Sequence, residues 1–249
     1  MQKIYLISLV AALSACSASD SSVAPGTGSG AGTGGSMARF TVAANRLYVL
    51  DRQKLVTYNV SASQNPTQVG QTNLSVDAET IFPFGDYLLM GSPTGLYIYD
   101  RVANPNQPTY VSQYNHLFSC DPVVAQGTIA YATLRSGTNC RNGQNLLDVV
   151  DISNWKAPRL IKSYPMKNPH GLGVDGNLLF VCEGDFGLRV LSVADPKNPV
   201  EVQYFPDVAA YDVIPQSKVL IVTAKDGIYQ YRYSDNSPLK LLSKLAVQP

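Results

Sequence analysis

The sequence predicts an all-β fold, a β-propeller of about five four-stranded blades. Three observations predict it. Two independent strand markers recur about every 41 residues, a proline precedes each unit's fourth apolar segment, and no helical period of useful length occurs. A single four-stranded unit would expose two apolar faces, and stacking the units around an axis covers both.

The first marker is an apolar segment expected to form the second strand of each unit, and its starting positions differ by 41, 42, 49 and 41 residues. These segments are 47–50, 88–91, 130–133, 179–182 and 220–223. The second marker, the expected third strand, has spacings of 41, 51, 41 and 40 residues. It covers 55–60, 96–101, 147–152, 188–193 and 228–233, and the prolines that follow are Pro66, Pro108, Pro158, Pro199 and Pro238.

The first strand of each unit is expected to line the central channel and to be an edge strand. It contains Pro83 and Pro215 at matching offsets, with Pro122 near its start in another unit. Proline is excluded from central strands and tolerated on an edge, so these positions fit the propeller.

Polar residues at the starts of the first strands are expected to meet at the channel mouth. Counting nine residues back from the start of each second strand reaches Glu79, Asp121, His170 and Tyr211 in units two to five. Asp212 follows Tyr211, and Arg39 lies one residue beyond the corresponding position in the first unit. Carboxylates, an imidazole and a guanidinium from separate blades could bind a divalent cation, a sugar or a peptide. The alternative is that these groups only pair with one another and with backbone amides at the rim.

The third-strand motif followed by an Asn-Pro or Asp-Pro turn, as in 147–152 and 188–196, resembles the LVIVD-repeat proteins. Segments 120–124 and 169–176 are similar to the branch found in Bacteroidetes-type lipoproteins. The resemblance covers roughly residues 37 to 245 and implies a bacterial surface or periplasmic propeller, often a lipoprotein, with no established enzymatic activity. Longer relatives carry further repeats upstream of a Gly-rich join, which leaves open whether five blades close alone.

The N-terminus is expected to be a targeting device. Residues 1–15 read as a lipoprotein signal peptide, with Lys3 before a short apolar run that is too short to span a bilayer. The run ends in a Leu-Ser-Ala-Cys sequence that resembles the bacterial lipobox, so lipidation is expected at Cys16. Residues 16–37 are rich in Gly and Ser and read as a flexible tether, and residues 38–249 as the propeller.

Three cysteines remain after lipidation. Cys120 and Cys140 flank an extra loop at residues 134–146, and an exported protein favours a disulfide between them. Cys182 lies in an apolar strand and is expected to be a small buried hydrophobe.

Charge and missing motifs narrow the function. Without Lys3 the chain has 18 basic and 18 acidic residues, so no basic field favours nucleic acid. No nucleophile elbow, phosphate loop or metal-ligand pair occurs, and no cofactor or metal is expected. We expect a lipid-anchored, non-enzymatic binding protein of the bacterial cell envelope, with a protein or glycan ligand. The alternative is a hydrolase or lyase with acid-base residues at the channel mouth.

Overall fold

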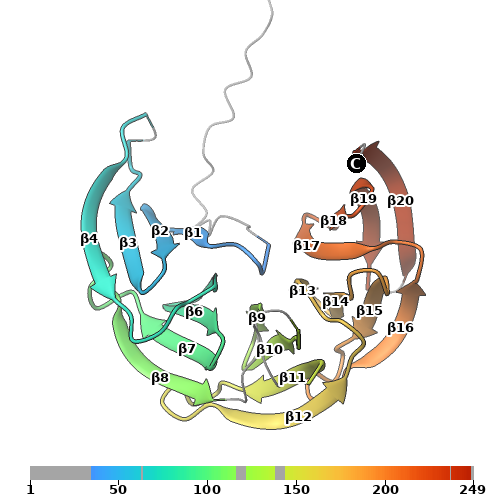
Figure 1. Ribbon diagram of the computed structural model, residues 1–249, viewed down its shortest axis with the longest axis horizontal. Helices are drawn as coiled ribbons and strands as arrows, with labels where there is room; N and C mark the ends of the chain where they lie inside the picture. Colours follow the sequence, from blue (N-terminus) through green and yellow to red (C-terminus); the bar gives the residue numbers. More distant parts are fainter. Residues whose placement is uncertain (1–34, 63, 116–121, 138–143, 236, 248–249) are drawn as a thin grey trace, which may run out of the picture.

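The computed structural model describes residues 35–247 except 63, 116–121, 138–143 and 236. The described part folds into twenty strands that form five four-stranded antiparallel sheets, each built from consecutive strands (Figure 1). The prediction of an all-β propeller with five four-stranded blades is confirmed. Within the described residues, no helix is long and apolar enough to cross a membrane.

Each blade uses four strands in chain order. Blade 1 has β1 (Phe40–Ala43), β2 (Arg46–Asp51), β3 (Lys54–Asn59) and β4 (Thr67–Asn73). Blade 2 has β5 (Thr80–Phe84), β6 (Tyr87–Ser92), β7 (Gly95–Asp100) and β8 (Thr109–Asn115). Blade 3 has β9 (Val123–Gln126), β10 (Ile129–Leu134), β11 (Leu146–Asp151) and β12 (Arg159–Pro165). Blade 4 has β13 (Leu172–Asp175), β14 (Leu178–Cys182), β15 (Leu188–Ser192) and β16 (Val200–Phe205), and blade 5 has β17 (Ala210–Gln216), β18 (Val219–Ala224), β19 (Gly227–Ser234) and β20 (Ser237–Ala246).

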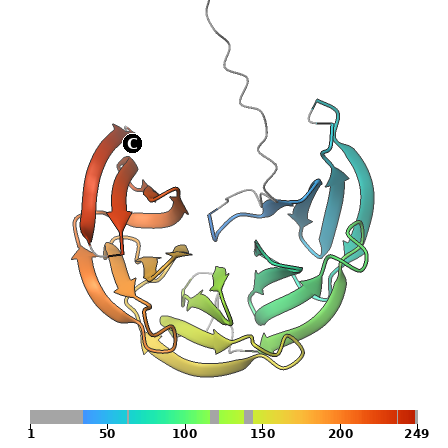
Figure 2. The same cartoon turned by 180° about the vertical axis from the view of Figure 1, so that it is seen from behind.

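The blades stand around a common centre, with the first strand of each blade innermost and the fourth outermost (Figure 1). The inner strands of consecutive blades contact one another from β1 through β5, β9 and β13 to β17. The arc does not close. Blade 1 and blade 5 lie on opposite sides of an opening that is seen from both directions (Figures 1 and 2).

Two local features follow the repeat. Pro83 and Pro215 lie in β5 and β17, which are edge strands of their sheets, as the sequence predicted. The pairing of the third with the fourth strand also shifts register in every blade after the third residue of the repeated third-strand motif, and blade 5 has a second shift between Arg232 and Ser234. The shifts common to all blades follow Thr57, Ile98, Val149, Val190 and Gln230.

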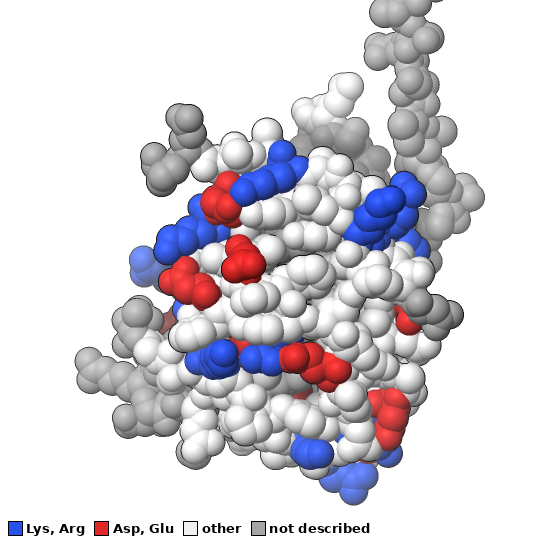
Figure 3. Space-filling view, turned by 90° about the vertical axis from the view of Figure 1, so that its right-hand side faces the viewer, with Lys and Arg blue, Asp and Glu red and all other residues white. Residues whose placement is uncertain are grey.

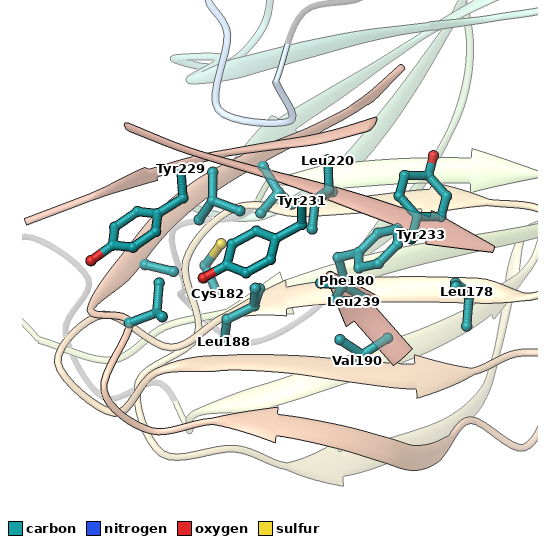
Figure 4. Close-up of a cluster of buried hydrophobic side chains, with 14 residues drawn as sticks. Leu178, Phe180, Cys182, Leu188, Val190, Leu220, Tyr229, Tyr231, Tyr233 and Leu239 are labelled. Carbon is teal, nitrogen blue, oxygen red and sulfur yellow. The ribbon is translucent and has the colours of Figure 1, made fainter. Parts of the chain in front are cut away.

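The hydrophobic core consists of four interfaces between neighbouring blades. Figure 4 shows the interface between blades 4 and 5, where Phe180 and Val190 face Leu220 and Tyr231. Side chains of this size each contribute about 1.5–3 kcal/mol when fully buried. We call the face that a blade presents to the next blade in the chain its forward face. The opposite face, which it presents to the previous blade, is its backward face. Cys182 is buried here, as predicted, whereas Cys16, Cys120 and Cys140 lie outside the described residues.

Among the described residues, one charged side chain has no exposed surface. Glu183, just after β14, has no exposed surface, and its Oε1 accepts a hydrogen bond of 2.6 Å from the backbone amide of Lys167. Its Oε2 pairs with the guanidinium of Arg189, which also pairs with Glu201. A buried carboxylate is tolerated only when it is paired in this way.

Candidate functional site

A small pocket lies at the centre of the arc, where the inner strands begin. It has a volume of about 180 Å³ and is lined by Met37, Arg39, Glu79, Thr80, Pro122, Arg135 and His170. Larger hollows open elsewhere on the surface, including one of about 580 Å³ beside Tyr99 and Tyr110. The central pocket brings together charged groups and a histidine from different blades. It is smaller than the usual pocket for a drug-sized ligand, so it suits a single chemical group.

The structure brings together three of the predicted mouth residues, Arg39, Glu79 and His170. Arg39 is exposed just before β1, and Glu79 is half-buried just before β5. Burial raises the pKa of the Glu79 carboxyl, while the nearby Arg39 and Arg135 guanidiniums counteract this and Asp77 adds to it. The pocket therefore carries two guanidiniums against one carboxylate among the described residues.

His170 is an uncharged hydrogen-bonding group at neutral pH. Burial, helped by the charge of Arg135, lowers its pKa from 6.5 to about 4. Its Nε2 lies 3.2 Å from the amide nitrogen of Asn168, which can only donate, so Nε2 accepts and Nδ1 carries the hydrogen. The ring of Tyr211 meets the imidazole edge to face, with 5.1 Å between ring centroids. Tyr211 thus positions the imidazole without lining the pocket.

Asp212 is drawn away from the pocket by residues 35–38, which we call the bridging segment. Ser36 Oγ donates to Asp212 Oδ1 at 3.3 Å and accepts from the backbone amide of Leu172 at 2.7 Å. The carbonyl of Ala38 accepts from the amide of Ile81 at 3.0 Å, so the segment links blades 2, 4 and 5 across the centre. A Cβ atom on Gly35 would lie 2.0 Å from Asp212 Oδ2, so any other residue there would force the Asp212 carboxylate to move.

The remaining predicted residue, Asp121, lies outside the described residues. Sequence reasoning missed Arg135, which follows β10 where the extra loop begins, because the counting considered only the starts of the first strands. A cation near the start of an inserted loop, next to the predicted mouth, was the available signal.

The described residues offer limited means for acid-base chemistry. Glu79 is the one carboxylate among the described residues that line the pocket, and glycoside hydrolysis normally uses two. Among the same residues, no group of three or more His, Cys, Asp or Glu is placed to hold a metal ion. The arrangement is better suited to binding an anionic group, because guanidiniums recognise carboxylates in a planar, bidentate manner.

Asp212 should make the stability of the folded chain fall as pH rises. Burial raises its pKa from 3.8 to about 6, against the hydrogen bonds from Val213, Ser36 and Met37 that lower it. The folded state therefore binds more protons than the unfolded state between about pH 4 and pH 6, and stability is lost across that window. In Asp212→Asn this loss, about 2 kcal/mol, should be absent. Urea unfolding at pH 4.5 and pH 7 measures it, and an identical pH dependence in both proteins would contradict it.

Comparison with known proteins agrees with this fold. The LVIVD repeat model matches residues 142–165, which contain β11 and β12 of blade 3. No curated protein matches the chain in sequence.

Solved propeller structures resemble it at low identity. A functionally unknown protein from Desulfotomaculum acetoxidans has a TM-score of 0.69 and 11% identity, over 82% of this chain and 67% of that one. A periplasmic gluconolactonase from Pseudomonas aeruginosa has a TM-score of 0.61 and 14% identity, over 82% of this chain and 68% of that one. BamB from Moraxella catarrhalis has a TM-score of 0.56 and 11% identity, over 76% of this chain and 54% of that one. The chain is therefore a β-propeller protein that carries an LVIVD repeat in its third blade.

Proposed function

We propose that this propeller is a non-enzymatic binding protein of the bacterial cell envelope, whose central pocket takes the carboxylate of an acidic glycan or peptide. The observation that carries the proposal is the composition of the pocket. Arg39 and Arg135 line it together with the uncharged His170, and Glu79 is the one carboxylate among the described residues that line it. A volume of about 180 Å³ has room for one such group while the rest of the ligand stays outside.

The envelope location rests on the N-terminal sequence. The apolar run and Cys16 support export and a lipid anchor, which would hold the pocket near a membrane. Two of the solved structures of similar fold are BamB and a periplasmic gluconolactonase. Mass spectrometry of the mature N-terminus, which we expect to begin with acylated Cys16, checks this part of the proposal.

The surface charge supports a localised rather than a diffuse binding site. On the side formed by blade 5 and its neighbour, basic and acidic side chains are interspersed and separated by uncharged surface (Figure 3). The chain carries 19 basic and 18 acidic residues, so it lacks the net positive charge that attracts nucleic acid. Specificity would therefore come from the few groups in the pocket.

Glucuronate is a suitable first probe, because glucose is its neutral counterpart of the same shape. Calorimetric titration should detect glucuronate and not glucose, and Arg39→Ala should weaken binding by about tenfold, as expected for a lost charge-assisted hydrogen bond. The matched control is Arg159→Ala, which removes the same charge from an exposed pair with Asp151 far along blade 3. Binding of both sugars alike, or an equal effect of the two substitutions, would contradict the proposal.

The hydrolase or lyase alternative rests on the presence of Glu79 and His170 in one pocket. A histidine with a pKa of about 4 is a weak base, which argues against it. Incubating the protein with acidic oligosaccharides or aldonolactones, in place of glucuronate, tests the hydrolase or lyase alternative. Cleavage no faster than in a protein-free blank, followed by nuclear magnetic resonance, is the outcome expected of a binding protein.

A further inference from the structure

Among the described residues, none packs as a blade against the backward face of blade 1. This face is formed by Phe40, Leu47, Val49, Val56 and Tyr58, which pair across β1, β2 and β3 and so point to the same side. Phe40 is 58% exposed. The residues at its register position in the other blades are at most 1% exposed, and these are Ile81, Val123, Leu172 and Val213. The same positions are thus core in four blades and surface in the first.

Blade 5 leaves the opposite face open. Its forward face contains Ile214, Ile221, Ile228 and Leu245, which are again register partners across the sheet. Ile228 is 38% exposed and Leu245 is 67% exposed. The residues equivalent to Ile228 in blades 1 to 4 are at most 2% exposed, and these are Leu55, Leu96, Leu147 and Leu188. Exposed apolar surface of this extent and arrangement marks an interaction site.

The two open faces are of opposite kind. Every interface inside the chain joins the forward face of one blade to the backward face of the next, as Tyr48 and Leu50 of blade 1 join Leu88 and Met90 of blade 2. An occupant of the opening must therefore offer a backward face to blade 5 and a forward face to blade 1. A β-blade of this same repeat has both faces, and it would continue the existing interfaces.

The size of the opening indicates two blades. Five blades correspond to 67% and 68% of the chains of the two similar propellers described above. The remaining third of each is enough for about two more blades of equal length. A second copy would bring five blades into this space, which is more than the remaining third can hold.

We propose that the open faces of blades 1 and 5 bind a partner polypeptide that folds as two tandem four-stranded β-blades and completes the ring. The partner's contact with blade 5 is apolar around Ile221 and Ile228. It also carries an acidic group, because Arg232 and Lys240 are paired neighbours on the same forward face. Blade 3 shows that such a face accommodates a carboxylate, since Asp148 is 2% exposed on its backward face and accepts from Tyr114 at 3.0 Å. This inference does not depend on the ligand of the central pocket.

Photo-crosslinking of the full chain in the cells that encode it tests the proposal. The probe, p-benzoylphenylalanine, replaces Val49 in one variant and Ile221 in another, and Val202, exposed on β16 of blade 4, in the control. We expect the first two variants to cross-link to one and the same polypeptide, identified by its peptides as two four-stranded repeats of about 41 residues, and the control to give no such product. Three results would overturn the proposal: cross-links to a second copy of this chain, cross-links to different proteins from the two positions, or no cross-link after complete photolysis of the probe.

A second variant separates loss of the partner from loss of folding. Ile221→Arg places a charge on an already half-buried position, so the purified chain should keep its circular dichroism spectrum and its unfolding midpoint. In cells, the same substitution should reduce the cross-link from position 49 at least tenfold. The control substitution Val202→Arg should leave that cross-link at full yield. An undiminished cross-link with Ile221→Arg would show that blade 5 does not hold the partner, which contradicts a ring completed between the two faces.

Discussion

Aspartate in place of Val181 should unfold the isolated protein, whereas aspartate in place of Val49 should not. The two valines occupy the same repeat position, on the backward faces of blade 4 and blade 1. Val181 has no exposed surface, so its replacement would bury a carboxylate without a partner, at a cost of about 4 kcal/mol or more. Val49 is only half-buried at the open face, and the same change there should cost about 1 kcal/mol.

Urea unfolding followed by circular dichroism measures both values under one condition. Val222→Asp is a second test of the buried class, because Val222 occupies the same position in blade 5 and is also fully buried. Equal losses for Val49→Asp and Val181→Asp would mean that blades 1 and 5 close on each other in solution. The comparison therefore tests the open arc independently of any partner.

Replacing Arg189 with leucine should destabilise the protein by about 3 kcal/mol, because it leaves the buried Glu183 without its cationic partner. The backbone amide of Lys167 would remain as a hydrogen-bond donor to Oε1, but Oε2 would lose its cationic partner at a place with no exposure to water. The unfolding free energy from urea titration gives this loss directly. The outer partner of Arg189, Glu201, is partly exposed, so Glu201→Gln should change stability by less than about 1 kcal/mol.

The double variant identifies the cause of that loss. Glu183→Gln removes the buried charge but keeps an acceptor for the Lys167 amide, so adding it to Arg189→Leu should restore most of the stability. If the double variant is as unstable as Arg189→Leu alone, the arginine acts through packing on Tyr204, whose ring lies 4.8 Å from the guanidinium carbon, rather than through its charge.

The strand order of this fold was predictable from its sequence because each blade reuses the same spacing of apolar segments. The second-strand markers at 47–50 and 179–182 fall within β2 and β14, and the third-strand markers fall on β3 and β15 with small differences at the ends. A strand with a fixed register has only two ways to point its side chains, so the pairing within each blade also decides which side chains share a face. A repeated spacing of apolar segments can be read from a single sequence without any knowledge of contacts between distant residues.

The candidate site was predicted only in part. Arg39, Glu79 and His170 meet because the inner strands begin at the same level around the centre. Asp212 belongs to the same level, but its hydrogen bond to Ser36 turns it to the bridging segment, and that contact joins residues 176 positions apart. No local pattern reports such a pairing. The opening between blades 1 and 5 was likewise left undecided, because the number of blades that completes a circle depends on the angle between neighbouring sheets.

The bridging segment also sets the order in which the molecule can mature. Ser36 is among the first folded residues to be synthesised, while Asp212 follows 176 residues later. At about 5–20 residues per second, the ribosome delivers the second partner roughly 10–35 s after the first. The bond between Ser36 and Asp212 can therefore form only after the four earlier blades have been synthesised. A nascent chain truncated before blade 5 could still attach the bridging segment to Ile81 and Leu172, but it would lack the contact with Asp212.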